Sequence, residues 1–411
     1  MDYSKENPSR RVVITGLGVI SSIGIGWEEF WKNLISGVSG INRISSFDTS
    51  FYDCHFAGEV KNFAPEVFLN KRKIHKIGRA SQMAIAASKL AIKDADFSLK
   101  HLEKTDRVAV CIGTTGGEIG LLEKFNDYRL KFSKEIPKDH LPIFPASSLS
   151  ANIALEFKMS GPNLVFGTAC AAGNFAIAKV FDFIRARKID YGLAGGADGS
   201  SRIVFTGFGR LYDIAPEKCQ PFDKNRKGMI PGEGAGVLFL EILESALKRK
   251  AHIYAEILGY GLSCDAHTMA YPSVEGIIKA IRRALNESQV QESEIDYISA
   301  HGTGTKENDK VECQAYKRVF GKLSTKIPIS SIKSMLGHTM GAASAFESIA
   351  CCLAIDQGEI PPTINFEEKD PECNINCVPN KGRQHKVQIA LNNSQAFGGN
   401  NACLAFCKLE I

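Results

Sequence analysis

The sequence predicts an α/β fold that is duplicated, with two similar halves that each alternate β-strands and α-helices. Two observations support this prediction: apolar, strand-like runs end repeatedly in glycine-rich turns, and the order of these runs in the first half recurs in the second. The chain has 411 residues, of which 44% are hydrophobic and 23% charged, so it can bury a large core. We place the halves at residues 1–251 and 252–411, with a seam near residues 252–261.

Three pairs of segments make up the repeat. The segments 106–117 and 295–305 each have the pattern of a strand that enters a Gly/Thr turn. The other two pairs are residues 162–170 with 328–338 and residues 190–240 with 388–406. Ligands of open α/β sheets bind at the carboxyl ends of strands, so the equivalent strand ends of both halves should face one common centre.

The first strand, residues 12–19, is expected to run into a Gly/Ser turn before a helix at residues 27–34. Gly16 and Gly18 could begin a dinucleotide-binding fingerprint. However, Ser21 occupies the position of the third glycine, and no acidic residue clearly ends a second strand. A nucleotide site is therefore disfavoured.

A basic segment, residues 70–76, opens a stretch that continues as an Ala-rich helix to Ala91. One interpretation is a solvated basic helix face. The other is a docking patch for an acidic carrier, because clustered cations steer an anionic partner before specific contacts form. The candidate docking residues are Lys71, Arg72, Lys73 and Lys76.

Composition argues against several classes of protein. The net charge is only +5, with no basic tract beyond residues 71–73, which does not indicate a nucleic-acid partner. No apolar run approaches the roughly 18 residues of a membrane helix. The 12 cysteines include no CxxC pair, and the chain shows no secretory signal. This pattern favours reduced thiols in the cytoplasm over disulfides or a metal site.

The segment from Leu164 to Asn174 reads as a strand, a tight turn, Cys170 and then a helix with apolar residues at helical spacing. Unpaired backbone N–H groups and the positive end of the helix dipole would favour a thiolate at this position. Cys170 is therefore a candidate nucleophile. The alternative is a buried cysteine in an Ala/Gly-rich packing turn.

Chemically active side chains also follow other strand ends that should face the same centre. His301 follows one apolar run, Lys333 and His338 follow another, and the turn at residues 397–399 follows a third. Each histidine alone could be a structural hydrogen-bonding residue. Together with Cys170 they make a set of one thiol, two imidazoles and one amine, which packing explains poorly.

Four segments resemble the active-site blocks of β-ketoacyl-acyl-carrier-protein synthases. They are residues 167–173 (GTACAAG), 301–305 (HGTGT), 333–338 (KSMLGH) and 393–401 (NSQAFGGNN). The resemblance covers nearly the whole chain from Val12 onward. Within this family, the chain is most similar to the catalytic alpha ketosynthase of bacterial type II polyketide synthases. This finer similarity rests on residues 301–309, 361–365 and 370–373.

The resemblance implies a thiolase-like fold of five layers, αβαβα, a dimeric assembly and a ping-pong condensation. Cys170 would attack an acyl thioester, and the backbone N–H groups of Cys170 and Phe397 would form the oxyanion hole. His301 and His338 would donate hydrogen bonds to the enolate formed when malonyl carrier protein loses carbon dioxide. Lys333 would orient the histidines.

Further roles follow from the same resemblance. Glu347 would be the structural ion partner of Lys333, although an exposed helix position is the alternative for this residue. Phe397 matches a gating phenylalanine, and Gly398 and Gly399 would allow the backbone of the gate to move.

The sequence also departs from the family pattern. Ala396 replaces a glycine found in many relatives and Asn400-Asn401 replaces a Thr-Asn pair, which predicts a less mobile gating loop. Gly116 falls where fatty-acid enzymes carry a bulky residue at the base of the acyl channel, which predicts a roomier channel.

The expected partner is an acyl carrier protein, which holds the substrates on its phosphopantetheine arm, and no bound cofactor is expected. The polyketide interpretation implies a heterodimer with a chain-length factor. The alternative, a fatty-acid elongating β-ketoacyl-carrier-protein synthase II, implies a homodimer.

Cys170, His301 and His338 argue against a non-catalytic chain-length factor. A thiolase would carry a second cysteine near Phe397, a chalcone-synthase-like enzyme would use a Cys-His-Asn set, and a cysteine hydrolase would not need Lys333 with paired histidines.

Overall fold

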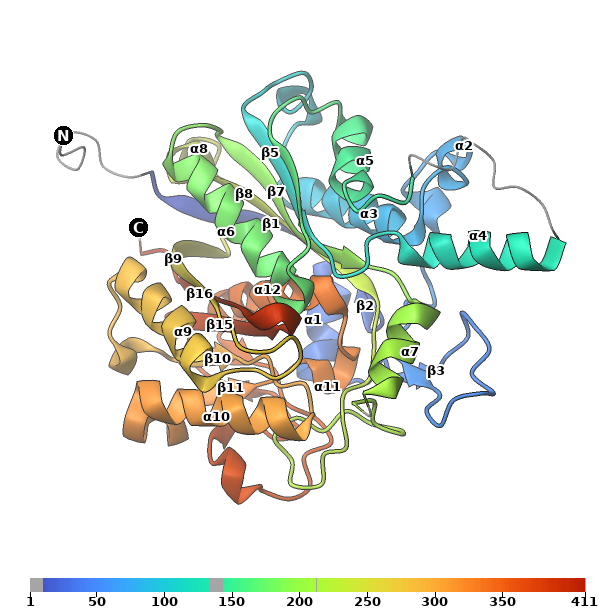
Figure 1. Ribbon diagram of the computed structural model, residues 1–411. Helices are drawn as coiled ribbons and strands as arrows, with labels where there is room; N and C mark the ends of the chain where they lie inside the picture. The colour runs from blue at the N-terminus through green and yellow to red at the C-terminus, as the bar shows by residue number, and fades with distance from the viewer. Residues whose placement is uncertain (1–9, 133–142, 212, 411) are drawn as a thin grey trace.

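The computed structural model of the protein describes residues 10–132, 143–211 and 213–410 (Figure 1). Its centre is a mixed β-sheet with the strand order β13-β11-β10-β15-β16-β9-β1-β8-β7-β5-β6. The strands of this path are β1 (Val12–Ser21), β5 (Val108–Gly113), β6 (Asn163–Phe166), β7 (Tyr191–Asp198), β8 (Gly234–Ile242), β9 (Ala255–Cys264), β10 (Tyr297–Ser299), β11 (Pro328–Ser330), β13 (Asn376–Cys377), β15 (Ile389–Ala396) and β16 (Asn400–Cys407).

The two halves of this sheet have the same topology. In the first, β1 pairs antiparallel with β8 and β8 antiparallel with β7, whereas β7, β5 and β6 run parallel. In the second, β9, β16 and β15 pair antiparallel, whereas β15, β10 and β11 run parallel. The antiparallel pairing of β1 with β9 joins them. The repeat of segments in the sequence therefore corresponds to a repeat of strands.

Helices fill three layers around the two halves of the sheet. α3 (Arg79–Asp94) packs on β1 and β8, and α9 (Val274–Ser288) packs on β9 and β16. Between them, α6 (Ala172–Arg185) and α12 (Ala343–Gln357) contact each other and strands of both halves. Figure 1 shows α6 and α12 near the middle of the molecule. This arrangement confirms the predicted five-layered, thiolase-like fold.

The main hydrophobic core surrounds this central helix layer. α12 is buried over almost its whole length, from Ala343 to Ile355, because it has sheet on both sides and α6 beside it. Phe181 of α6 and Phe346 of α12 belong to this core. A helix that is apolar all round is expected for such a position.

Gly16 and Gly18 lie inside β1, as predicted, and the strand continues to Ser21, two residues beyond its predicted end. α3 packs directly on the backbone at these glycines. A Cβ atom on Gly18 would lie 1.8 Å from the carbonyl oxygen of Ala87, and one on Gly16 would lie 2.1 Å from that of Ala91. The two glycines therefore serve close helix–strand packing.

Two further predictions concern the first 95 residues. The expected helix after the first strand is α1 (Trp27–Ile35). The basic segment forms a separate short helix, α2 (Lys71–Ile74), before α3 begins at Arg79. Among the described residues, no helix has the length and apolar character needed to cross a membrane.

Candidate active site

Cys170 lies in a 3₁₀ turn, Ala169–Ala171, that joins β6 to the start of α6. Ala169 adopts a positive φ of 47°, a conformation that is strained for an alanine and that bends the chain sharply before the cysteine. The side chain of Cys170 is buried, with 6% of its surface exposed. Strand, turn and helix therefore place the cysteine as the sequence predicted.

Burial opposes the thiolate that the helix N-terminus was expected to favour at Cys170. Burial raises the pKa of its thiol from 9.0 to about 12, and Lys333 only partly offsets this effect. The nearby carboxylates of Asp198 and Glu347 raise the thiol pKa further. Cys170 is therefore a protonated thiol at neutral pH, because desolvation outweighs the positive charge of Lys333.

His301 follows β10, and His338 follows the short helix α11 (Lys333–Leu336). Ligand atoms of Cys170, His301 and His338 lie within 4.8 Å of one another, although the three residues come from distant parts of the chain. The two imidazole rings are 5.5 Å apart and nearly perpendicular, at 83°. The structure thus brings the thiol and both imidazoles into one site.

Hydrogen bonds define which nitrogen of each imidazole faces the cavity as a donor. The N–H of Met340 donates to Nδ1 of His338 at 3.2 Å, and Nζ of Lys333 lies 3.4 Å from Nδ1 of His301. Burial and the positive charge of Lys333 hold the pKa of both histidines well below the usual value. Both rings are therefore neutral, accept at Nδ1 and carry their hydrogen on Nε2.

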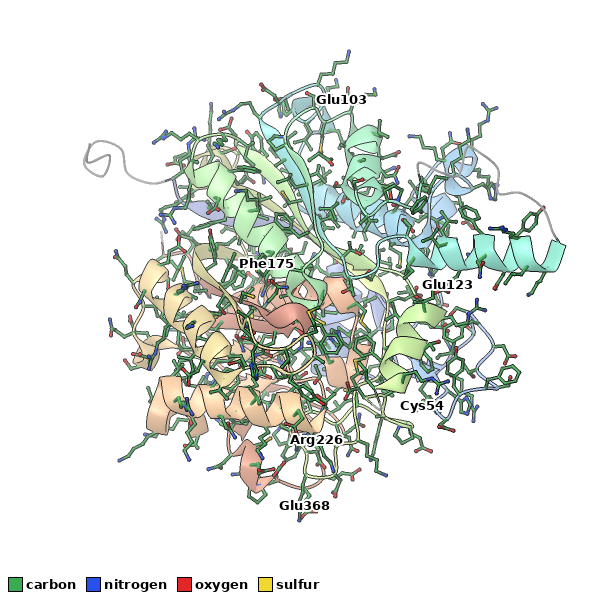
Figure 2. All side chains as sticks on the ribbon, in the orientation of Figure 1. Cys54, Glu103, Glu123, Phe175, Arg226 and Glu368 are labelled. Atoms are coloured by element: carbon green, nitrogen blue, oxygen red, sulfur yellow. The ribbon has the colours of Figure 1, made fainter. Side chains whose placement is uncertain are left out.

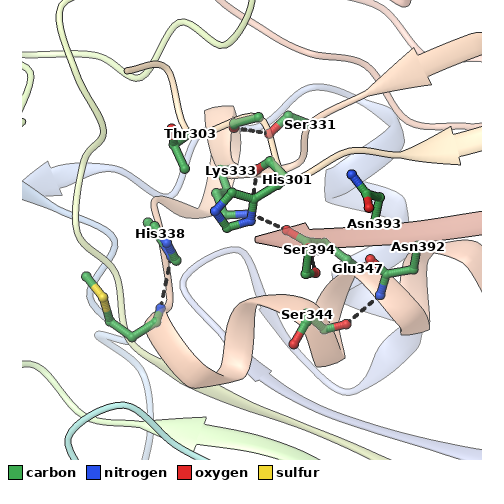
Figure 3. A network of polar contacts seen from close by, with 12 residues as sticks. His301, Thr303, Ser331, Lys333, His338, Ser344, Glu347, Asn392, Asn393 and Ser394 are labelled. Atoms are coloured by element: carbon green, nitrogen blue, oxygen red, sulfur yellow. Dashed lines mark hydrogen bonds and ion pairs between the residues drawn. The ribbon is translucent and has the colours of Figure 1, made fainter. Parts of the chain in front are cut away.

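Lys333 is fully enclosed, and Figure 3 shows the polar network around it. Its Nζ donates to the carbonyl oxygen of His301 at 2.6 Å and forms an ion pair with Glu347 of α12. Ser394 of β15 donates to the other carboxylate oxygen of Glu347 at 3.1 Å. Burial raises the pKa of Glu347 to about 7 despite the ammonium group. Glu347 is thus a buried partner of Lys333, and the exposed alternative does not apply.

Two carboxylates that the sequence analysis missed hold the loop after His301. Both lie on α10 (Lys306–Phe320) and are fully buried. Glu312 accepts from the N–H groups of His301 and Gly302, each at 2.8 Å, and Asp309 accepts from the N–H of Thr303 at 3.0 Å. Their spacing of three residues puts both on the apolar face of α10. Two acidic residues on an apolar helix face are the sequence feature that could have predicted this buried pair.

The turn that contains Phe397 contacts the Cys170 turn. The ring of Phe397 lies 5.4 Å from that of Phe208, on α7 (Arg202–Arg210). Gly398 and Gly399 have positive φ angles of 79° and 73°, which favour glycine.

Asn401 ties this turn to the rest of the sheet. Its Nδ2 donates to the carbonyl oxygen of Gly399 at 3.1 Å and to Asp265 at 2.7 Å. Ala396 is half-buried and lines the site. These contacts restrain the segment that was predicted to be the gate.

Gly116 lies in a turn that is held by the buried carboxylate of Asp198. Asp198 accepts from the N–H of Gly116 at 2.9 Å and from that of Gly341 at 2.7 Å, close to His338 in the chain. Burial raises the pKa of Asp198 to about 6. Gly116 is not among the residues that line the cavity around Cys170.

A cavity of about 660 Å³ contains Cys170, His301, His338 and Phe397 in its wall. The exposed Lys227 and Lys306 also line it, together with the exposed Glu307. Lys224 lines it too and forms an ion pair with Glu368, so lysines outnumber acidic residues at the rim. Arg226 is buried between these lysines. It forms an ion pair with Asp370 and donates to the carbonyl oxygen of Lys306, the first residue of α10, at 3.1 Å. Figure 2 labels Arg226 and Glu368 below α10.

The four predicted docking cations lie apart from this cavity wall. All four are exposed, and Lys73 also pairs with Glu156 at 2.7 Å. A separate hollow of about 750 Å³ is lined by Ile74, His75 and residues of α4 (Ile119–Phe132).

The thiol and two imidazoles could also serve as ligands of a zinc ion. The ammonium group of Lys333, 3.4 Å from His301, opposes a second positive charge at this position. Neutral donors around a thiol suit a thioester and its oxyanion better than a metal.

Two family models and a relative match this chain over most of its length. Residues 9–246 match the family model of the β-ketoacyl synthase N-terminal domain, and residues 254–367 match that of the C-terminal domain. The chain is 38% identical over 411 residues to 3-oxoacyl-[acyl-carrier-protein] synthase 2 of Synechocystis sp. (strain ATCC 27184 / PCC 6803 / Kazusa), covering 98% of this chain and 99% of the relative.

Two solved structures are similar over the whole fold. The ishigamide ketosynthase/chain length factor has 44% sequence identity and a TM-score of 0.95, covering 98% of this chain and 100% of the other. AntDE:AntF, a type II polyketide synthase acyl-carrier protein in complex with its ketosynthase bound to the hexaketide, has 32% identity and a TM-score of 0.90, with the same coverage. The chain therefore belongs to the β-ketoacyl synthase family of acyltransferase-type condensing enzymes.

Proposed function

We propose that the protein is the catalytic ketosynthase subunit of a type II polyketide synthase, which condenses malonyl carrier protein with an acyl or polyketide chain held on Cys170. The observation that carries the proposal is the single cavity in which the buried thiol of Cys170 lies beside the neutral imidazoles of His301 and His338. The higher identity, 44%, to the ishigamide ketosynthase/chain length factor supports the polyketide assignment.

Acyl transfer is the first step. The sulfur of Cys170 attacks the thioester carbon, and its proton goes to the departing thiol of the carrier arm, so no net proton is consumed. The N–H groups of Cys170 and Phe397 stabilise the oxyanion, and each such donor contributes about 10² to 10³ in rate. A thiol with a raised pKa makes proton transfer part of this step.

Decarboxylation and condensation follow. Malonyl thioester loses carbon dioxide, and Nε2–H of His301 and His338 donates to the oxygen of the enolate. The enolate carbon then attacks the acyl thioester on Cys170, the C–S bond breaks, and the cysteine takes up one proton. Lys333 fixes the orientation of His301 through its contacts with the ring and the carbonyl group. No bound cofactor is required.

The partners follow from two surfaces. The lysine-rich rim of the cavity suits the anionic arm of a carrier protein, and the exposed cations of α2 offer a second contact for an acidic carrier. β6 is an edge strand with the exposed residues Asn163 and Leu164, and a second subunit can extend the sheet there. We propose a chain-length factor as this subunit and the cytoplasm as the location, since all 12 cysteines are free.

A fatty-acid elongating synthase is the second candidate, and the 38% identity to 3-oxoacyl-[acyl-carrier-protein] synthase 2 favours it. Native mass spectrometry of the protein, expressed alone and with the products of neighbouring genes, separates the two. A one-to-one complex with a homologue that lacks the cysteine supports the polyketide subunit. A homodimer that elongates saturated acyl carrier protein alone would contradict that assignment and support the fatty-acid enzyme.

A further inference from the structure

Gln395 is the one residue in the wall of the Cys170 cavity, among the described residues, whose side-chain amide is buried without a partner. Its exposed fraction is 2%, and neither Oε1 nor Nε2 has a hydrogen-bond partner. Other polar groups in the same wall are paired: Thr303 bonds Thr305 at 2.9 Å, and Asn308 bonds Asp309 at 3.1 Å. Leaving an amide unpaired costs free energy, which a bound ligand can recover.

The strand β15 directs Gln395 away from the Lys333–Glu347 network. Side chains alternate along a strand, and Figure 3 shows Asn393 on the side opposite to Asn392 and Ser394. Asn393 donates to Glu312 of α10 at 3.1 Å, whereas Ser394 donates to Glu347. Gln395 shares the face of Asn393, so Glu347 is not its partner, and its amide belongs to the cavity wall.

We propose that Gln395 is a specificity-determining residue whose Nε2–H donates to an oxygen on C3 of the substrate thioester. This inference rests on the proposed function. Gln395 lies two residues before Phe397, and the backbone N–H of Phe397 is assigned to the thioester oxyanion. The oxygen that it reaches therefore lies only a few bonds from the thioester carbon.

Two substrates of a ketosynthase carry an oxygen at C3, and both offer the same chemistry to an amide donor. One is the ketone of a growing 3-oxoacyl chain, and the other is the carboxylate of the malonyl group. A saturated acyl chain offers no acceptor there. A site built to hydrogen-bond a substrate group discriminates against the analogue that lacks it, because the amide is then left unpaired.

The test compares three substrates on one carrier protein: 3-oxooctanoyl and octanoyl thioesters as acyl donors to Cys170, and malonyl thioester for decarboxylation. Acylation is followed by intact-protein mass spectrometry. The variants are Gln395→Leu and Gln395→Met, two apolar side chains of similar size, so that one remains if the other does not fold. Gln220→Leu is the matched control, since Gln220 is 5% exposed but donates to the carbonyl oxygen of Asn365 at 3.0 Å.

For each protein, the rate of acylation by 3-oxooctanoyl thioester and the rate of malonyl decarboxylation are each divided by the rate of acylation by octanoyl thioester. This gives a 3-oxooctanoyl ratio and a malonyl ratio. The expected result is a loss of about tenfold in one or both ratios in the Gln395 variants, with both ratios kept in Gln220→Leu. Loss of the 3-oxooctanoyl ratio assigns the donor to the growing chain, and loss of the malonyl ratio assigns it to the malonyl carboxylate. Unchanged ratios, including an equal fall in all three rates, would overturn the inference. Wild-type protein that accepts no acyl group from any donor would instead refute the proposed function.

Discussion

The protonation state of Cys170 can be tested through the pH dependence of its alkylation. Burial raises its thiol pKa from 9.0 to about 12, a shift of three pH units. At any pH below 9, the thiolate fraction is therefore about 10³-fold smaller than that of an ordinary cysteine. The rate of reaction with iodoacetamide should rise about tenfold for each pH unit from pH 6.5 to 9.5, without a plateau.

The assay measures alkylation at each cysteine by peptide mass spectrometry, with the exposed Cys264 as a reference within the same protein. Restricted access to a buried site lowers the rate by the same factor at every pH, so the shape of the profile reports ionisation. A plateau for Cys170 below pH 8 would refute the reasoning. It would show that the helix N-terminus and Lys333 outweigh desolvation.

Three further outcomes are expected. His301→Ala and His338→Ala should each lower malonyl decarboxylation by about 10² to 10³, measured as carbon dioxide release, because each removes one donor to the enolate; a loss below threefold would contradict that role. Gly18→Ala should lower the free energy of unfolding in urea by about 1 to 3 kcal/mol, because its Cβ would clash with the carbonyl oxygen of Ala87, and full stability would contradict the packing argument. Asp198 has a folded-state pKa raised to about 6 from 3.8, so the stability it contributes is present below pH 4 and lost as the pH rises through 6. The free energy of unfolding of Asp198→Asn, measured in denaturant relative to wild type, should therefore rise by about 3 kcal/mol from pH 4 to pH 7. A difference between the two proteins that stays constant with pH would exclude this linkage.

The fold was predictable because each half repeats the same local patterns. Apolar runs that end beside glycine mark the strand ends, and the residues that follow β6, β10, β11 and β15 meet in one site. The positions of Cys170, His301, Lys333 and His338 in one site follow from that convergence alone. Their catalytic roles rest on the resemblance and on the experiments described above.

What the sequence could not provide depends on contacts between residues far apart in the chain. The thiolate expectation for Cys170 used only the adjacent helix, whereas the desolvation that reverses it comes from the whole surrounding fold. The packing role of Gly18 was not predicted because α3, which packs against it, lies about 70 residues later. Asp198 and Gln395 drew no attention, since their importance lies in burial and in the presence or absence of partners.

The proposed mechanism requires that Cys170 carry the chain that the malonyl unit extends. Purified protein, with its partner if one is found, is incubated with octanoyl and malonyl carrier proteins, and the products are analysed by mass spectrometry. The expected products are an octanoyl adduct on Cys170, then a 3-oxodecanoyl carrier protein and one carbon dioxide per product. Cys170→Ala should yield neither the adduct nor the product. Elongation by Cys170→Ala at the wild-type rate would exclude Cys170 as the nucleophile.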